Sequence, residues 1–251
     1  MTWLEFDSLV NARDVGGIAT TDGGVIASRR LIRTDNLQSL TEADIARFDE
    51  LGVTDVVDLR SAYEVANEGP GPLVGHPGIT FHHHSYLPEG DSDTDDALPW
   101  VGLESSVQVD NLFASHYLSY LADRPESVLA ALRAIAYADG AAVVHCAAGK
   151  DRTGTTAALA LRLAGAHIDQ VVADYALSTE RIEAIVGKLM RSPTYHDNLA
   201  GRPMSSHETH PETMHAVLHH LDENYGGVEG LLSRIGWTDA DTAAMRTKLR
   251  G

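Results

Sequence analysis

The stretch HCAAGKDRTG, residues 145–154, contains the only cysteine of a chain of 251 residues. Cys146 follows the short apolar run AAVVH (141–145), which predicts a buried strand, and the run TGTTAALALRLAGA (153–166) predicts a helix. The backbone N–H groups of a loop at such a junction can point inward and, with the positive end of the helix, form an anion site. Gly149 permits the backbone angles that such a loop needs.

The other side chains of this loop fit a bound phosphate. Ala147 and Ala148 are small enough not to obstruct it, and Arg152 can hold two phosphate oxygens at once. The same positive field stabilises the thiolate form of Cys146. The expected chemistry is in-line attack on phosphorus through a cysteinyl-phosphate intermediate. A buried core cysteine is the usual alternative, but it leaves the accompanying glycine, arginine and threonine unexplained.

HCAAGKDRTG resembles the signature of the cysteine-dependent protein tyrosine phosphatase superfamily, which reads H-C, five residues, R, and then S or T. Within that superfamily the chain is similar to a bacterial group of tyrosine/serine phosphatases. The likeness covers most of the chain and is weak over 85–125. The stretches that carry it are NARDVGG (11–17), VVDLRSAYEVANEGPG (56–71), GKDRTG (149–154) and VVADYALS (171–178).

The resemblance implies a role for each residue of the signature. Cys146 would be the nucleophile, and Arg152 would clamp the phosphate and stabilise the transition state. Thr153 would assist the departure of the cysteine in the second step, and His145 would help to hold the thiolate. The phosphate-binding residues would be Ala147, Ala148, Gly149, Lys150, Asp151 and Arg152.

An alkoxide leaving group also needs a proton donor. The Trp-Pro-Asp stretch that supplies it in typical tyrosine phosphatases is absent, since Val101 follows LPW (98–100). The similar bacterial enzymes have an aspartate directly before the arginine, so we expect Asp151 to be the general acid. Asp58 and Asp91 are the reserve candidates. Alternatively, Asp151 forms an ion pair that orients a neighbouring arginine.

Several other polar residues are expected to support the site. In similar sequences a lysine at the position of Lys150 accompanies substrates that carry more than one phosphate, although a lysine there can also simply face solvent. Asp58 and Arg60 of the DLR stretch could brace the loop from the adjoining strand, and Asp14 could do the same from NARDVGG.

The order of the predicted elements indicates an α/β fold with a central, mostly parallel sheet flanked by helices, as in protein tyrosine phosphatases. VTDVVDLR (53–60) predicts a second buried strand, and SLTEADIARFDELG (39–52) and PESVLAALRAIAYA (125–138) predict helices. Ser39 with Glu42 and Thr209 with Glu212 have the spacing of capping boxes, and Thr238 could cap a last helix. We expect one phosphatase domain over 1–251. Its helical third, 168–251, would contribute pocket walls or a lid together with 85–115.

Composition limits the possible partners. The formal net charge of −17 favours solubility and argues against a nucleic-acid surface or adhesion to anionic membranes. No run of 18 apolar residues predicts a transmembrane helix. The acidic, non-basic start and the single cysteine favour the cytoplasm, with export without a leader still open.

The histidines and the acidic run EGDSDTDD (89–96) raise the question of a metal. The acidic run lacks the glycine and glutamate that a calcium loop needs at its sixth and twelfth positions. HETH has the wrong spacing for a zinc motif, and His215 and His219 are expected on a solvated helix face. We therefore expect no metal and no cofactor.

The sequence thus predicts a phosphomonoester hydrolase acting on phosphotyrosine, phosphoserine/threonine or phosphoinositides. A phosphatase of a small soluble metabolite, such as a phosphorylated nucleoside, is the first alternative. A rhodanese-like sulfurtransferase or a phosphate-binding pseudo-enzyme is the second. The arginine-threonine pair that follows the cysteine after five intervening residues disfavours the sulfurtransferase, and the presence of Cys146, Arg152 and Thr153 together disfavours the pseudo-enzyme.

Overall fold

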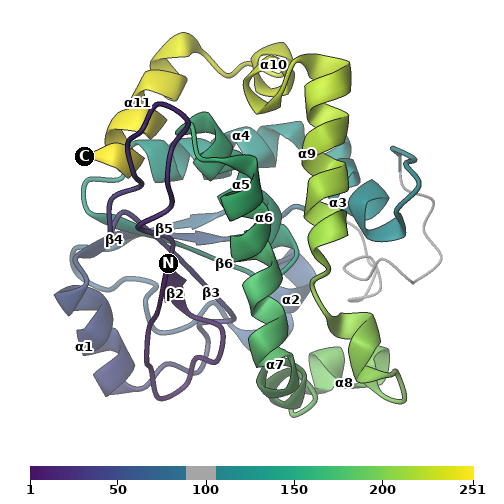
Figure 1. Cartoon of the computed structure of the whole chain (residues 1–251). Helices are drawn as coiled ribbons and strands as arrows, with labels where there is room; N and C mark the ends of the chain where they lie inside the picture. Colours follow the sequence, from purple (N-terminus) through teal and green to yellow (C-terminus); the bar gives the residue numbers. More distant parts are fainter. Residues whose placement is uncertain (89–105) are drawn as a thin grey trace.

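A computed structural model of the chain describes residues 1–88 and 106–251. Six strands form one sheet in the order β1-β2-β3-β6-β4-β5, with helices on both faces (Figure 1). Strands β3, β6, β4 and β5 run parallel, and β1 and β2 join the edge antiparallel, which confirms the predicted mostly parallel α/β fold. The strands are β1 Thr2–Trp3, β2 Arg13–Asp14, β3 Leu31–Thr34, β4 Val53–Asp58, β5 Thr80–His83 and β6 Ala141–His145.

The helices match the predicted runs to within a few residues at their ends. Helices α6 to α11, joined by short turns, make up the predicted helical third of the chain. The helices are α1 Glu42–Glu50, α2 Ala62–Glu68, α3 Leu112–Asp123, α4 Pro125–Ala136, α5 Arg152–Leu163, α6 Ile168–Ala176, α7 Ile182–Leu189, α8 Pro193–Leu199, α9 Pro211–Tyr225, α10 Val228–Arg234 and α11 Asp239–Arg250.

Strand β6 is the centre of the molecule. All of its residues are buried because helices cover the sheet on both sides, which is why residues 141–144 are all apolar instead of alternating with polar ones. Ala141 and Val143 pack into the core cluster that contains Phe48 of α1. Ala142 and Val144 pack into the larger cluster formed with α3, α4 and α5.

The strand register brings three loops to one edge of the sheet. His145 lies opposite Thr34 of β3 on one side and opposite Asp58 of β4 on the other. These parallel strands therefore end at the same level, and the segments that follow them meet. The carboxyl edge of a parallel sheet is where α/β proteins bind ligands.

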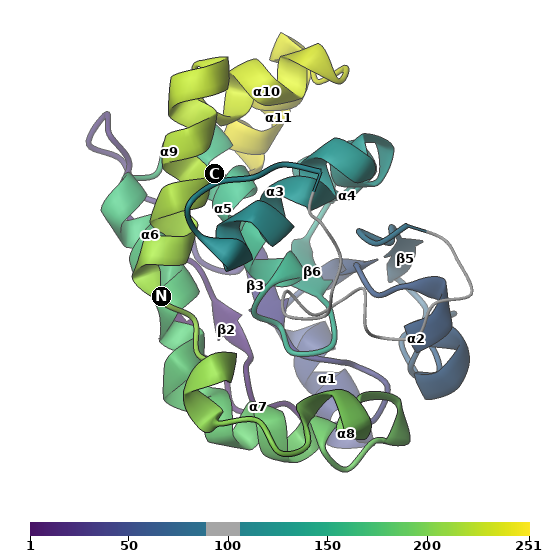
Figure 2. The same ribbon diagram turned by 90° about the vertical axis from the view of Figure 1, so that its right-hand side faces the viewer.

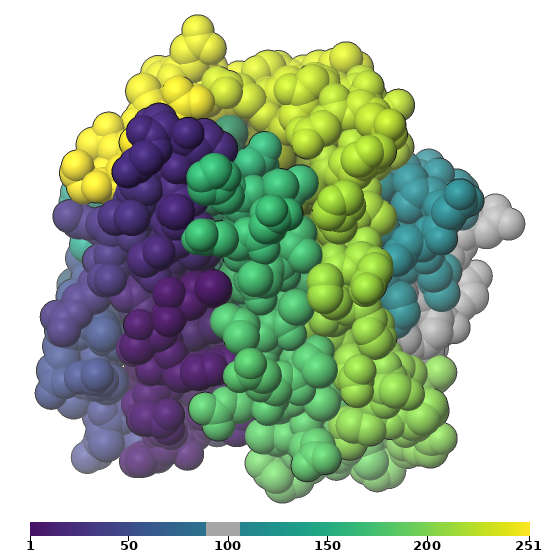
Figure 3. Space-filling model, in the orientation of Figure 1, coloured from purple at the N-terminus to yellow at the C-terminus, as the bar shows by residue number. Residues whose placement is uncertain are grey.

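The C-terminal third packs along one side of this sheet. Figure 2 shows α6 and α9 beside the strands, with α7 and α8 toward one end of the molecule and α10 and α11 toward the other. In the space-filling view the N-terminal segment, α6 and α9 form adjoining bands from purple through green to yellow-green (Figure 3). None of the helices in the described part of the chain has the length and apolarity needed to cross a membrane.

Two of the predicted capping boxes are wrong. Helix α1 begins two residues later than Ser39 suggests: Thr41 accepts the N–H of Asp44, and the Asp44 carboxylate accepts the N–H of Thr41. The same carboxylate also accepts a hydrogen bond from Ser8 Oγ at 2.6 Å. This tertiary contact, which local spacing does not reveal, selects the later start.

The second wrong box is at the start of α9. The hydroxyl of Thr209 donates to the carbonyl of Ala176 at 3.1 Å and therefore ties α9 to α6 instead of capping the helix. His210 occupies the N-cap position without a side-chain bond, and Pro211 begins the helix. A proline fits there because the first helical N–H has no partner within the helix.

The predicted cap of the last helix is present and gives a test of the fold. Thr238 accepts the N–H of Asp241 at 3.2 Å, and Asp241 accepts the N–H of Thr238 at 3.0 Å. We expect Thr238→Ala to lower the free energy of unfolding by about 1 kcal/mol. The N–H of Asp241 loses its acceptor, and the Asp241 carboxylate loses the hydrogen bond from the threonine hydroxyl. Urea denaturation followed by circular dichroism measures this change, and an unchanged midpoint would contradict the assignment.

Candidate active site

The loop of residues 146–151 joins β6 to α5 and fixes its shape through Gly149. This glycine has φ of 70°, in the left-handed region. A Cβ atom there would lie 2.6 Å from the carbonyl oxygen of Thr34 and from the nitrogen of Asp35. Gly149 is therefore required both for its backbone angle and for the close approach of the loop to the end of β3.

The carbonyl oxygens of this loop are turned away from its concave side by donors that lie behind it. The pairs are Asn36 N–H to Ala147 O at 3.1 Å, Asn11 Nδ2 to Ala148 O at 2.9 Å, and Arg33 Nη2 to Gly149 O at 2.9 Å. The N–H groups of residues 147–151 have no acceptor in the described part of the chain. A loop with its carbonyls held outward presents its N–H groups inward, which is the arrangement of an anion-binding nest.

Asp174 of α6 holds two of these donors in place. Its carboxylate pairs with Arg33 Nη1 at 2.6 Å and with Arg13 Nε at 2.9 Å, and Arg13 in turn donates to Asn11 Oδ1 at 2.9 Å. Burial would raise the pKa of Asp174, but the charges of Arg13 and Arg33 lower it below its ordinary value. This carboxylate therefore stays ionised between the two arginines.

Arg152, the first residue of α5, is fixed by a carboxylate that the sequence reasoning missed. Its Nη1 and Nη2 lie 2.5 and 2.9 Å from the two oxygens of Glu64, and Nη1 also donates to the carbonyl of Leu59 at 3.3 Å. The Nε–H and the second N–H of Nη2 have no acceptor among the described residues, so one edge of the guanidinium stays available for a ligand.

Glu64 is completely buried on α2, where it also caps the helix by accepting the N–H of Ser61 at 2.7 Å. Burial would raise the pKa of Glu64, but the Arg152 charge lowers it below its usual range. The capping-box spacing of Ser61 and Glu64 within RSAYE was the local signal that could have identified this carboxylate.

Asp58 and Arg60 lie at the end of β4 as a fully buried pair. Arg60 Nη2 donates to Asp58 at 2.7 Å, and Arg60 Nη1 donates to Asn36 Oδ1 at 3.1 Å. The pair therefore reaches the loop through Asn36, whose N–H holds the carbonyl of Ala147. Burial would raise the pKa of Asp58, but His145 and Arg60 lower it to about 2. Asp58 is therefore ionised and holds Arg60 in place behind the loop.

His145 lies beneath the loop. Its Nδ1 is 3.4 Å from the carbonyl oxygen of Cys146, and its Nε2 is 3.7 Å from Asp58. Burial lowers the pKa of His145 to about 4, although Asp58 opposes the shift. The imidazole is therefore neutral near pH 7, and any support it gives to the cysteine comes from its position and not from a positive charge.

Cys146 begins the loop, and Thr153 lies just beyond its end, on α5. Cys146 is 1% exposed, and the loop that it begins leads into the positive N-terminus of α5. The hydroxyl of Thr153, on the first turn of that helix, is buried and has no hydrogen-bond partner in the described part of the chain. A buried hydroxyl without a partner is costly, which makes Thr153 available for a group that enters the site.

Asp151 and Lys150 form the rim of the loop. Lys150 Nζ donates to Asp151 Oδ1 at 2.9 Å, and the hydroxyl of Tyr117 on α3 donates to the same oxygen. Burial would raise the pKa of Asp151, but Lys150 and Tyr117 lower it below its ordinary value. The other ionisable groups that act on Asp151 from packed elements are His116, Tyr120, Tyr175 and His207.

Helices α7 and α8 of the C-terminal third pack on the loop. Ala147 belongs to one apolar cluster with Tyr195 and Leu199 of α8, and Ala148 belongs to another with Ile182 and Ile185 of α7. The hydroxyl of Tyr195 also donates to Glu64 at 3.1 Å. Residues far apart in the sequence thus surround the Arg152–Glu64 pair.

Other predicted residues lie away from the loop or outside the described part. Asp14 closes the N-terminal loop by accepting the N–H groups of Gly16 and Arg29 at 2.9 and 2.8 Å, and so does not brace the site. Asp91, the LPW stretch and the proposed calcium run fall within 89–105, outside the described residues.

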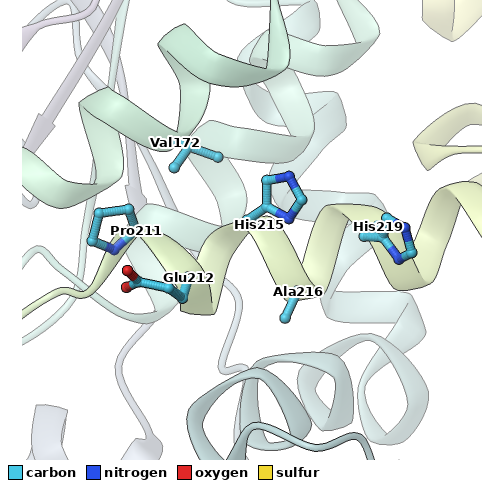
Figure 4. A pocket seen from close by; sticks show the side chains of 6 residues that line it. All are labelled: Val172, Pro211, Glu212, His215, Ala216 and His219. Carbon is cyan, nitrogen blue, oxygen red and sulfur yellow. The ribbon is translucent and has the colours of Figure 1, made fainter.

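The C-terminal histidines do not converge on a metal site. A hollow of ≈ 460 Å³ between α6 and α9 is bordered by His215 and His219, whose rings stack 6.1 Å apart (Figure 4). His219 faces Glu223 at 3.2 Å instead of a shared ion. Among the residues that the structure describes, no three His, Cys, Asp or Glu side chains are grouped so as to hold a metal.

The sequence model of the tyrosine phosphatase family matches residues 4–251. The chain belongs to this family. It is 29% identical over 282 residues to the triple specificity protein phosphatase PtpB of Mycobacterium tuberculosis, with all of both chains covered. It is also 31% identical over 233 residues to a tyrosine-protein phosphatase of Nostoc commune, covering 89% of this chain and 75% of that one.

A third relative is a putative tyrosine-protein phosphatase of Cupriavidus necator. The chain is 32% identical to it over 179 residues, which cover 71% of this chain and 63% of that protein. Family membership, the cysteine signature and these relatives establish the chain as a cysteine-dependent phosphatase of the tyrosine and dual-specificity type.

Gly149 gives a direct test of the loop geometry. We expect Gly149→Ala to abolish the binding of vanadate, an oxyanion of phosphate shape, because its Cβ would displace the loop from the backbone of Thr34 and Asp35. Gly52→Ala is the matched control, since Gly52 also has a positive φ of 72° but no atom lies within 4 Å of its added Cβ. Both variants carry a strain of roughly 1–2 kcal/mol. Calorimetric binding of vanadate that survives in Gly149→Ala would contradict the geometry.

Proposed function

We propose that Cys146 is the nucleophile of this phosphatase and that residues 147–152 bind the phosphate. The single observation that carries the proposal is the loop around Cys146, whose carbonyls are held outward and whose N–H groups have no acceptor in the described part of the chain. The inward N–H groups and the α5 terminus offer several donors to one dianion. They stabilise the thiolate and the phosphate at the same point.

The reaction has two steps. In the first, Cys146 Sγ attacks phosphorus, the S–P bond forms, and the bond from phosphorus to the leaving oxygen breaks in line with it. In the second, water attacks the phosphocysteine, and the S–P bond breaks to release inorganic phosphate. The free edge of Arg152 binds two oxygens of the transferring group in both steps. The unpaired hydroxyl of Thr153 donates to the departing sulfur.

Asp151 is the proposed general acid. It gives a proton to the leaving oxygen in the first step and takes one from the attacking water in the second. Lys150 and Tyr117 keep the free carboxyl ionised. A phosphate dianion in the cradle raises its proton affinity by repulsion between like charges, so binding and protonation occur together. Once Asp151 is protonated, it no longer carries the negative charge that attracts Lys150. Lys150 can then bind a second acidic group of the substrate.

The proposed substrates are phosphotyrosine, phosphoserine/threonine and phosphoinositides. The name of the mycobacterial relative, a triple specificity protein phosphatase, supports a site that accepts more than one ester. The alternative is a small soluble phosphomonoester such as a phosphorylated nucleoside, and the net charge of −17 favours it over a lipid at an anionic membrane. We propose no nucleic-acid partner, no membrane insertion and no cofactor.

We further propose that residues 1–251 act as one phosphatase domain in the cytoplasm. The packing of α7 and α8 on the loop supports a single unit, because the site is incomplete without the C-terminal third. The reducing cytoplasm suits the chemistry, since Cys146 must remain a thiolate to act as nucleophile.

Two substitutions test the first step. Cys146→Ser is expected to abolish turnover of p-nitrophenyl phosphate while still binding vanadate, since only the sulfur is lost. Arg152→Lys is expected to lower kcat by about 10²–10³-fold because a lysine cannot hold two oxygens at once.

Release of inorganic phosphate from phosphopeptides, phosphoinositides, nucleotides and sugar phosphates, with Cys146→Ser as the blank, identifies the substrate. Activity that persists in Cys146→Ser would contradict the proposal.

Asp151→Asn separates the acid from the nucleophile. We expect kcat/KM for phenyl phosphate to fall by about 10²-fold or more, while kcat/KM for p-nitrophenyl phosphate, whose leaving group needs no proton, changes little. For the wild type, kcat/KM for phenyl phosphate should decrease as pH rises, because the acid is active only when protonated. The variant should lack that dependence. Equal losses on both substrates would exclude Asp151 as the acid.

A further inference from the structure

A pair of tyrosine hydroxyl groups leads from α6 to the general acid proposed above. The hydroxyls of Tyr117 on α3 and Tyr175 on α6 lie 2.9 Å apart. The direction of these bonds is fixed at one end. Tyr117 donates its only proton to Asp151, so Tyr175 must donate to Tyr117.

Both hydrogen bonds to Asp151 arrive at one oxygen. Tyr117 and Lys150 donate to Oδ1, whereas Oδ2 accepts no hydrogen bond from the described residues. Two donors on Oδ1 disfavour a proton there and leave Oδ2 as the oxygen that can carry one. They also fix the plane of the carboxyl group, and therefore the direction in which the Oδ2 proton points.

We propose that Tyr117 is a positioning residue for leaving-group protonation, acting through Asp151 and supported by Tyr175. The inference rests on the proposed role of Asp151 and extends it to residues that touch neither sulfur nor phosphorus. Tyr117 is completely buried and its ring meets Tyr175 edge-on at 6.1 Å, so its hydroxyl has a single position from which to hold the carboxyl group.

Removal of one hydroxyl tests this role. In Tyr117→Phe the carboxyl group keeps Lys150 but loses the second bond that orients it. We expect kcat/KM for phenyl phosphate to fall about 10-fold, part of the about 10²–10⁴-fold that acid catalysis supplies, with p-nitrophenyl phosphate affected less than 2-fold. Tyr175→Phe should give a smaller loss of the same selectivity because it acts one bond further away.

Tyr86→Phe is the matched control. Tyr86 is 1% exposed and packs on Tyr120 in the same aromatic cluster, but its hydroxyl is hydrogen-bonded to Thr156 at 2.9 Å and not to Asp151. We expect this variant to leave the ratio of the two rates unchanged. Thermal denaturation of all three variants shows whether each is folded at the assay temperature.

The outcomes separate this inference from the proposed function. A wild-type chain that releases no phosphate from p-nitrophenyl phosphate would overturn the proposed function and this inference together. A leaving-group effect in Asp151→Asn that is absent from both Tyr117→Phe and Tyr175→Phe would overturn the positioning role alone. So would an equal loss in Tyr117→Phe and Tyr86→Phe, or a loss in Tyr117→Phe that is the same for both substrates.

Discussion

The site depends on one constraint: the loop after β6 must keep its carbonyl oxygens on its outer side. Each carbonyl that turned inward would place a partial negative charge against the thiolate and the phosphate. A buried carbonyl without a hydrogen bond is costly. The carbonyls can therefore point outward only if hydrogen-bond donors lie behind the loop. Asn11, Arg33 and the N–H of Asn36 supply them. The N–H groups that a phosphate would meet face inward because of these three bonds.

The buried charges serve the same constraint. Asp174 fixes Arg33 and orders Asn11 through Arg13, while Asp58 fixes Arg60 against Asn36. Buried ion pairs are weak sources of stability, because desolvation offsets their attraction. Here they set the direction of hydrogen bonds, which apolar packing cannot do. Loss of one partner would leave a buried charge unpaired, and the loop would lose a donor as well.

Residues that the sequence identified are those that local chemistry marks. Cys146, Gly149 and Arg152 stand within one short stretch at a strand–helix junction, so their spacing alone indicates a phosphate cradle. The parallel sheet followed from the same local order of strands and helices. The first residue of α1 was less predictable. It depends on a hydrogen bond from Ser8 to Asp44, which joins two separate segments and cannot be inferred from local sequence.

The residues that were missed act across long separations in the sequence. Asn11 and Ala148 are 137 residues apart, and Glu64 and Arg152 are 88 apart. Tyr117 and Tyr175 read as ordinary aromatic residues of apolar helices, since only the fold brings their hydroxyls together at Asp151. Asp58 lies near the site in a buried ion pair with Arg60, and its link to the loop through Asn36 is likewise a contact between distant segments.

A crystal structure of the protein with vanadate tests the central claim most directly. The account predicts vanadium over Cys146 Sγ, with its oxygens about 3 Å from the N–H groups of residues 147–151 and from the free edge of Arg152. The carbonyls of Ala147, Ala148 and Gly149 should keep their present donors. Vanadate bound elsewhere, or a loop with one of these carbonyls turned toward the anion, would contradict it.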